Sequence, residues 1–168
     1  MPRSREDLFR RLAELGIAVT TVEHDAVFTV AESTQLHREL PGGHSKNLFL
    51  KDKKGRLYLV VALSSTQVDL KKVGKSVGAS DRLSFGKAEL LVEVLGVQPG
   101  SVTPFSLIND TERRVTVVLD ADMMKHERLN FHPLENTATT NIARDDLVRF
   151  VKACGHEPLV LSISASSS

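Results

Sequence analysis

Several residue types that build particular kinds of site are scarce in this chain of 168 residues. It has no Trp and one Tyr, so a surface of stacked aromatic rings would depend on its seven Phe residues. The single Cys154 excludes an internal disulfide, and no apolar run approaches the ~20 residues that span a membrane. We therefore expect a cytoplasmic protein without membrane contact. The net charge of +1 gives a weak overall field, so a nucleic acid would have to be held by a local basic patch.

Sequence motifs that are typical of common cofactor sites and catalytic nucleophiles are also absent. The six His residues have no metal-ligand spacing and there is no Cys pair, so we predict no metal site. The chain has no phosphate-binding loop, no Gly-x-Ser-x-Gly elbow and no dinucleotide fingerprint, so we predict no cofactor. Cys154 falls in the last turn of a predicted helix, where the helix dipole opposes formation of a thiolate. It is therefore a poor candidate for a nucleophile.

The order of the predicted elements is that of an α/β protein, with helices packed on a mixed sheet. The length and the 41% content of hydrophobic residues fit one domain, which we place at residues 1–163 with a flexible tail at 164–168. We predict helices from Ser4 to Gly16, from Thr29 to Pro41, and at 68–77, 87–95 and 143–154, with Ser64-Ser65-Thr66 capping the third. A helical turn is predicted at 120–124, and strands at 17–22, 47–51, 56–63, 114–119, 128–131 and 158–163. The turn 52–55 makes the second and third strands a hairpin.

Three short segments place polar or Gly-Pro elements where a core pattern would not require them: residues 44–50, 100–104 and 131–136. Lys46 and Asn47 open an apolar strand, and Lys46 can hold a phosphate, a carboxylate or a developing oxyanion. Gly100 lets backbone N–H groups approach a ligand closely, and such groups can bind an oxyanion without any side chain. His132 precedes a proline at the end of a strand. Together they suggest a cleft that handles a carbonyl or an ester.

Each of these features also has an ordinary structural explanation. A lysine at the start of a strand commonly extends its amine into solvent, and Gly-Pro loops after helices are usually connections. A single histidine is more often structural than functional. In addition, Ser45 and Lys46 point to opposite faces of a strand, which argues against a Ser-Lys nucleophilic dyad. Considered alone, the residues indicate an α/β domain with a possible cleft of lysine and backbone amides.

The three segments, taken in order and with their spacing, closely resemble the YbaK/ProX family, the free-standing relatives of the editing domain of bacterial prolyl-tRNA synthetase. The resemblance covers nearly the whole chain. The run from Phe131 to Thr140 and the Lys46-Asn47 start are most similar to the branch that deacylates alanyl-tRNA(Pro). The resemblance implies a mixed α/β fold and hydrolysis of the ester that joins a wrong amino acid to the 3′ adenosine of tRNA(Pro). The ribose hydroxyl of the tRNA would assist an attacking water.

The resemblance also implies roles for individual residues. Lys46 would position the substrate through its terminal phosphate or ribose, with Asn47 beside it. The backbone amides of the Gly100–Pro104 loop would bind the carbonyl oxygen, with Gly100 and Ser101 as catalytic residues and Pro104 among the residues that bind the substrate. His132 would contact the aminoacyl group and help to set the size of the pocket. Two further residues are expected to line that pocket, Phe28 and Thr29.

The partner implied is tRNA(Pro) carrying a small amino acid, with no DNA partner. The lysines at 46, 51, 53, 54, 71, 72 and 75 are candidates for holding its phosphates, and prolyl-tRNA synthetase or an elongation factor could deliver it. Two alternatives remain open: deacylation of tRNA charged with Cys or Ser, and a non-catalytic module that binds tRNA or an amino acid.

Overall fold

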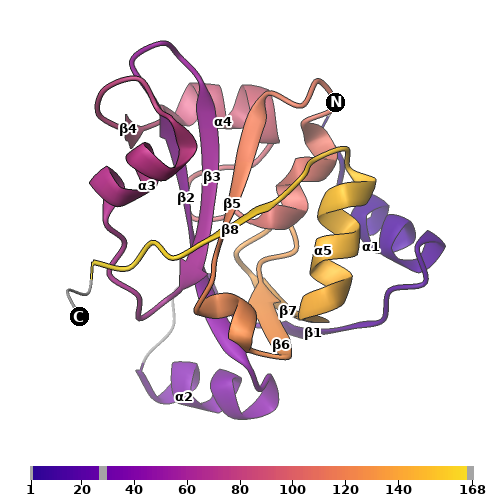
Figure 1. Ribbon diagram of the computed structural model, residues 1–168. Coiled ribbons are helices and arrows are strands. Elements are labelled where there is room, and N and C mark those ends of the chain that lie inside the picture. Colours follow the sequence, from indigo (N-terminus) through magenta and orange to yellow (C-terminus); the bar gives the residue numbers. More distant parts are fainter. Residues whose placement is uncertain (1, 27–29, 166–168) are drawn as a thin grey trace.

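A mixed eight-stranded sheet forms the centre of the protein in the computed structural model, which describes residues 2–26 and 30–165. Helices cover both faces of this sheet (Figure 1). The helices are α1 (Arg5–Glu14), α2 (Val30–Glu39), α3 (Leu70–Val77), α4 (Ala88–Leu95) and α5 (Arg144–Ala153), with 3-10 turns η1 (Pro104–Asn109) and η2 (Met123–Lys125). The strands are β1 (Val19–Glu23), β2 (Gly43–Lys51), β3 (Leu57–Leu63), β4 (Ser84–Phe85), β5 (Val115–Asp120), β6 (Arg128–Phe131), β7 (Ala138–Ala143) and β8 (Leu159–Leu161). The predicted α/β class with a mixed sheet is confirmed.

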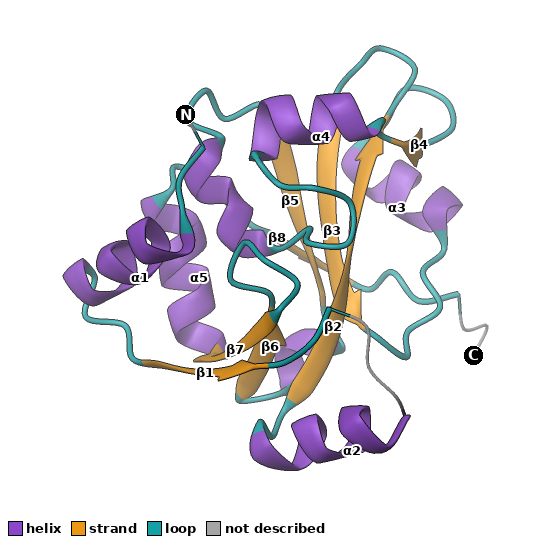
Figure 2. Cartoon of the chain, turned by 180° about the vertical axis from the view of Figure 1, so that it is seen from behind, coloured by secondary structure: helices purple, strands orange, loops and turns teal. Residues whose placement is uncertain are grey.

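Strand β2 joins the two halves of the sheet. The strand order is β1-β7-β6-β2-β3-β5-β8, with β4 paired to the outer part of β2. Among the described residues, β6 runs parallel to β2 and pairs with it at Gly43 and His44, whereas β3 follows β2 from Ser45 to Lys51 in an antiparallel ladder. The sheet therefore opens between β2 and β6 beyond His44, and Figure 2 shows these strands diverging.

The two faces of β3 belong to two different cores. Leu57, Leu59 and Val61 pack with α1, α4 and α5, while Tyr58 and Val60 pack with α3 on the other face. Because both faces are covered, β3 reads in the sequence as a continuous apolar run instead of an alternating one. Figures 1 and 2 both place α1 and α5 side by side, with α3 on the opposite side of the sheet.

Local signals predicted most element ends correctly. Ser4 and Asp7 form the predicted capping box, Gly55 has φ +84° in the hairpin turn, and Gly78 ends α3 in the left-handed conformation. The predicted cap of α3 at 64–66 is wrong. The helix begins later, and the side chain of Asp69 accepts hydrogen bonds from the first-turn amides.

The sequence-based predictions were less accurate for elements that depend on distant partners. The strand predicted at 47–51 starts four residues earlier, at Gly43, because its first residues pair with β6. The turn predicted at 120–124 is the 3-10 turn η2 instead. Strand β7 was not predicted, because its buried Thr139, Thr140 and Asn141 interrupt the apolar pattern. Their hydrogen bonds come from strands and loops remote in sequence.

The last described residues lie against the chain between β3 and α3. Ser164 forms a β-bridge with Val68, and the amide of Ala165 donates to the carbonyl of Gln67 over 2.7 Å. These two residues begin the segment that we expected to be a flexible tail. Within the part of the chain that the structure describes, no helix is long and apolar enough to cross a membrane.

Candidate functional site

A cavity of about 280 Å3 lies where the sheet opens between β2 and β6. Helix α2 contributes to it from one side, and the ends of β6 and β7 from the other. Its lining consists of Leu36, His37, His44, Ser45, Asn47, Ser64, Asn130, Phe131, His132 and Thr139. The structure thus brings together two predicted site residues, Asn47 and His132, from segments that are far apart in the sequence.

His132 is held as a neutral imidazole in this cavity. Its Nδ1 lies 2.8 Å from the carbonyl oxygen of Ala138, which can only accept a hydrogen bond, so Nδ1 carries the proton. Burial lowers the pKa of His132, and the neighbouring His24 ring, 6.2 Å away between centroids, adds to this effect. The bond to Ala138 works in the opposite direction but does not outweigh burial. The Nε2 atom of His132 is therefore a hydrogen-bond acceptor at neutral pH.

Asn47 brings an unsatisfied polar atom to the same cavity. Its Oδ1 is buried and has no hydrogen-bond partner among the described residues. A buried polar group without a partner costs about 1–3 kcal/mol, so native proteins rarely keep one without a functional reason. By contrast, the hydroxyl of the neighbouring Ser45 is used structurally, since it donates to the carbonyl of Asn130 over 2.7 Å. Asn47 is thus ready to bind a donor group of a ligand.

Lys46 is half-buried and does not line the cavity. It pairs with Ala62, which belongs to the core on the α3 face, whereas Asn47 pairs with Val61 on the other face. Alternation along β2 therefore directs Lys46 away from the face that carries Asn47. Within the described residues Lys46 forms no ion pair. Because β6 has left β2 at this point, the long lysine side chain lies beside the opening of the sheet.

The Gly100–Pro104 loop is built by its own hydrogen bonds. Thr103 caps η1 by accepting a bond from the amide of Phe105, and Pro104 occupies the first turn. The amide of Ser101 donates to the carbonyl of Gln98 over 3.0 Å, so it is already engaged. Gly100 has φ +93° and is exposed, and its amide makes no backbone bond among the described residues. The amide of Gly100 is therefore available to bind an oxyanion, whereas that of Ser101 is not.

The 131–136 segment connects this loop to the cavity. A Cβ atom on Gly100 would lie 3.6 Å from Nδ2 of Asn136, so the two loops are in contact. The same segment carries His132, and its Leu134 has φ +72°, a conformation that a branched side chain rarely adopts. The surrounding contacts must therefore hold this turn in place.

Arg5 supplies such a contact from helix α1. Its Nη1 donates a hydrogen bond to Glu23 on β1 over 2.6 Å, and its Nε forms an ion pair with Glu135 in the 131–136 segment at 2.8 Å, without the alignment of a hydrogen bond. The Arg5 side chain is 16% exposed, although both glutamates are largely exposed. The hydrogen bond that Arg5 donates to Glu23 is the main factor that raises the pKa of Arg5, so the guanidinium group is charged at every ordinary pH. Arg5 thereby ties the segment that carries His132 to α1 and β1.

Several residues at this site were not among those predicted from the sequence. Leu36 and His37 reach the cavity from α2, and the His37 ring stacks on His44 with centroids 3.8 Å apart. Nothing in the local pattern marks these residues, because their role depends on where α2 lies. The predicted pocket residues Phe28 and Thr29 lie outside the described residues. Among the described residues, no cluster of three or more His, Cys, Asp or Glu could hold a metal ion.

Comparison with known proteins agrees with this architecture. The sequence profile of the aminoacyl-tRNA editing domain matches residues 24–150. The chain is 42% identical over 162 residues to the mouse prolyl-tRNA synthetase associated domain-containing protein 1, with 94% of this chain and 95% of that protein covered. It is 37% identical over 154 residues to the prolyl-tRNA editing protein ProX of Acetoanaerobium sticklandii, covering 91% and 93% of the two chains.

A solved structure described as a candidate trans-editing enzyme for prolyl tRNA synthetase superposes with a TM-score of 0.73, covering 99% of this chain and all of the other. At 19% identity this likeness concerns the fold. The mixed α/β fold is therefore what this chain shares with that structure. By its sequence, the chain belongs to the aminoacyl-tRNA editing domain family.

Proposed function

We propose that this protein is a trans-editing deacylase that hydrolyses the ester of alanyl-tRNA(Pro). The observation that carries the proposal is the meeting of neutral His132 and the unsatisfied Oδ1 of Asn47 in one small cavity. Both atoms accept hydrogen bonds, so they suit the ammonium group of an aminoacyl ester. Membership of the editing domain family and the similarity to ProX support the same reaction.

The available groups favour attack by water over a covalent intermediate. Burial raises the pKa of the Cys154 thiol to about 11, and this residue lies at the end of α5, away from the cavity. The Ser45 hydroxyl is committed to Asn130. In our proposal the tRNA ribose hydroxyl assists the water. The free amide of Gly100 binds the carbonyl oxygen, where negative charge develops in the tetrahedral intermediate.

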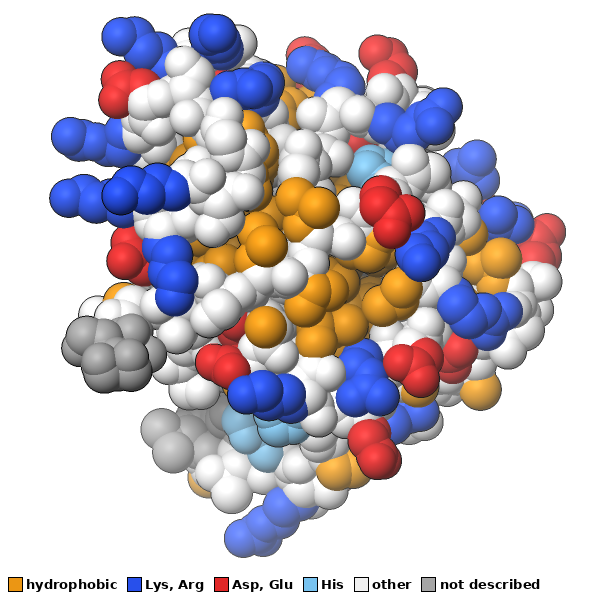
Figure 3. Space-filling model, viewed as in Figure 1, with side chains coloured by type: hydrophobic (Ala, Val, Ile, Leu, Met, Phe, Trp, Pro, Cys, Tyr) orange, Lys and Arg blue, Asp and Glu red, His pale blue; other side chains and the backbone are white. Residues whose placement is uncertain are grey.

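Lys46 would act outside the cavity, on the terminal phosphate of the tRNA, and not on the ester itself. This assignment agrees with its place beside the opening of the sheet, off the face that carries Asn47. Further phosphates would meet the basic edge formed by α3, where Lys71, Lys72 and Lys75 project. Figure 3 shows Lys and Arg side chains gathered along the edge of the molecule that carries α3. Delivery of tRNA(Pro) by prolyl-tRNA synthetase or an elongation factor, in the cytoplasm, completes the proposal.

A second site of this kind has a clear physical purpose. A synthetic site that accepts proline cannot exclude the smaller alanine well, because a missing methylene changes binding by only ~1–3 kcal/mol. A small hydrolytic cavity can admit alanine and reject proline by size. The cavity of about 280 Å3, bounded by Phe131 and Leu36, is a suitable place for this selection.

The decisive experiment compares deacylation of alanyl-tRNA(Pro) and prolyl-tRNA(Pro) by the purified protein. We expect alanine to be released at least ~100-fold faster than proline, because the larger proline ring does not fit into the cavity in the reactive position. Seryl- and cysteinyl-tRNA(Pro) belong in the same panel, because faster release of either would move the assignment to that amino acid. Tight tRNA binding without hydrolysis of any ester would instead indicate a non-catalytic module.

Removal of the Arg5 clamp should reduce hydrolysis more than stability. We expect Arg5→Ala to lower kcat about tenfold, because a displacement of ~1 Å in a site can cost as much as a factor of 100. Since Glu23 and Glu135 are both exposed, the unfolding free energy should change by only about 1 kcal/mol. The measurement is single-turnover deacylation alongside thermal unfolding.

The control for this variant is Arg10→Ala, which removes the same charge from the exposed face of α1, where Arg10 pairs with Asp7. It should leave kcat unchanged, and Arg5→Lys should restore part of the lost rate. If Arg5→Ala and Arg10→Ala behave alike, Arg5 does not position the site.

A further inference from the structure

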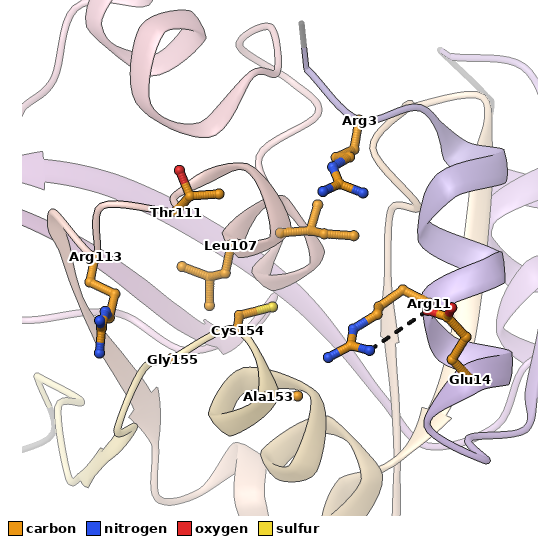
Figure 4. A pocket seen from close by; sticks show the side chains of 10 residues that line it. Arg3, Arg11, Glu14, Leu107, Thr111, Arg113, Ala153, Cys154 and Gly155 are labelled. Atoms are coloured by element: carbon orange, nitrogen blue, oxygen red, sulfur yellow. Dashed lines mark ion pairs between the residues drawn. The ribbon is translucent and has the colours of Figure 1, made fainter.

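A second cavity, of about 630 Å3, lies between α1, η1 and the end of α5. It shares no lining residue with the cavity around Asn47 and His132. Three arginines border it: Arg3 before α1, Arg11 on α1, and Arg113 in the turn before β5. Figure 4 shows Arg3 and Arg11 on one side of this cavity and Arg113 on the other, with Leu107 and Cys154 between them.

The positive charges around this cavity are poorly balanced. The one carboxylate in its lining is Glu14, whose Oε1 lies 3.6 Å from Nη1 of Arg11 in a largely exposed pair. Arg3 and Arg113 form no ion pair with any residue that the structure describes. Asp7, whose pKa is lowered chiefly by its hydrogen bonds with Ser4 and least by the charge of Arg3, already accepts bonds from Ser4 and Arg10. The cavity therefore carries an excess of positive charge that an anion would relieve.

Two of these arginines are held in place by the fold. The amide of Arg3 donates to Oδ1 of Asn109 over 2.7 Å, and the side-chain amide of Asn109 is itself bound to the carbonyl of Leu95. Arg113 has φ +57°, and its side chain lies across Gly155, where an added Cβ would come within 3.0 Å of Cδ of Arg113. These contacts fix the backbone of Arg3 and the aliphatic part of the Arg113 side chain beside the cavity, so both guanidinium groups start from positions within reach of it.

The floor of the cavity is apolar and uncharged. Leu107 is buried there, with Ile108 and Ala153 beside it. Burial keeps the Cys154 thiol protonated at neutral pH, although Arg11 opposes this effect. A cavity of this volume is large enough for a mononucleotide-sized ligand. Planar guanidinium groups match the oxygens of phosphate, and the apolar floor can take an organic part.

We propose that the cavity between Arg3, Arg11 and Arg113 binds a phosphate group, carried either by a small organic phosphate or by an RNA backbone. The site goes beyond the proposed deacylase function, because it lies on different elements and needs no aminoacyl ester. It would allow the protein to sense a phosphorylated metabolite, or to hold a second stretch of the tRNA at a distance from the cavity around His132.

The test is a titration of the full-length protein, at low salt, followed by amide chemical shifts in two-dimensional NMR spectra. The two probes are AMP and an RNA duplex that mimics an acceptor stem without an amino acid. We expect saturable shifts at Thr111, Arg113 and Gly155, and a Kd at least tenfold higher in the double variant Arg3→Gln, Arg113→Gln. The control Arg10→Gln removes one charge from α1 outside the cavity and should change Kd less than twofold.

Each outcome has a definite meaning. Shifts with AMP identify a small organic phosphate as the ligand, and shifts with the duplex alone identify the RNA backbone. The proposal is overturned if neither probe produces saturable shifts at these amides. It is also overturned if Arg10→Gln weakens binding as much as the double variant, because the attraction is then a general effect of charge. Amide chemical shifts of β3 and β5 that match those of the unmodified protein will establish that the variants are folded.

Discussion

Replacing Lys46 by alanine is expected to lower kcat/KM for alanyl-tRNA(Pro) about 100-fold, because a hydrogen bond to a charged group such as a phosphate contributes about 1.5–3 kcal/mol. Lys46 makes no ion pair within the described residues and does not line the cavity, so the fold should survive. If Lys46 holds the terminal phosphate in both the bound and the reacting substrate, much of the loss will be a higher KM. Steady-state kinetics with thermal unfolding as a check of folding measures both quantities.

Lys51 provides the matched control for Lys46. It lies on the same strand and carries the same charge, but it pairs with Leu57 and Ser84 at the far end of β2. Lys51→Ala should lose far less activity than Lys46→Ala, because Lys51 would at most add a peripheral attraction to tRNA. Equal losses in the two variants would mean that the lysines attract tRNA by general charge. Full activity of Lys46→Ala would remove Lys46 from the site and leave Asn47 and His132 as its main groups.

The second large effect is expected at Gly42, where α2 turns into β2. A Cβ atom on Gly42 would lie 2.3 Å from the backbone oxygen of Arg128, and φ is +106°. Because neither backbone can move without separating β2 from β6, we expect Gly42→Ala to destabilise the protein by more than ~4 kcal/mol. The same separation would displace Asn47 and abolish hydrolysis. Chemical denaturation and the yield of folded protein measure the effect.

A control at Gly55 separates the effect of the positive φ from the effect of the close contact with Arg128. It also has a positive φ, +84°, but no atom of residues 2–26 or 30–165 lies within 4 Å of its added Cβ. Gly55→Ala should therefore cost only the left-handed backbone conformation, about 1 kcal/mol, and leave the activity intact. If Gly42→Ala proves as mild as Gly55→Ala, the contact between β2 and β6 is looser than the structure indicates.

Part of the site could be predicted from the sequence. Three segments were selected because their polar residues interrupt a core pattern, and Asn47 and His132 from two of them do meet in one cavity. We expected Lys46 to lie in the same cleft as these two residues. Because neighbouring side chains on a strand point to opposite faces, Lys46 lies on the face of β2 opposite Asn47 and outside the cavity. The Ser101 amide was expected to be free, but its bond to Gln98 depends on the folded shape of the loop.

The sequence by itself determined the α/β class, most helix and strand positions, and the residues that mark the editing family. Those features follow from periodicity, capping residues and turn residues, which act over a few positions along the chain. Only the tertiary structure decided that the sheet opens between β2 and β6, that α2 closes one side of the cavity and that Arg5 holds the His132 segment. Contacts of this kind join residues more than 80 positions apart, and no local propensity encodes which distant partner a side chain will find.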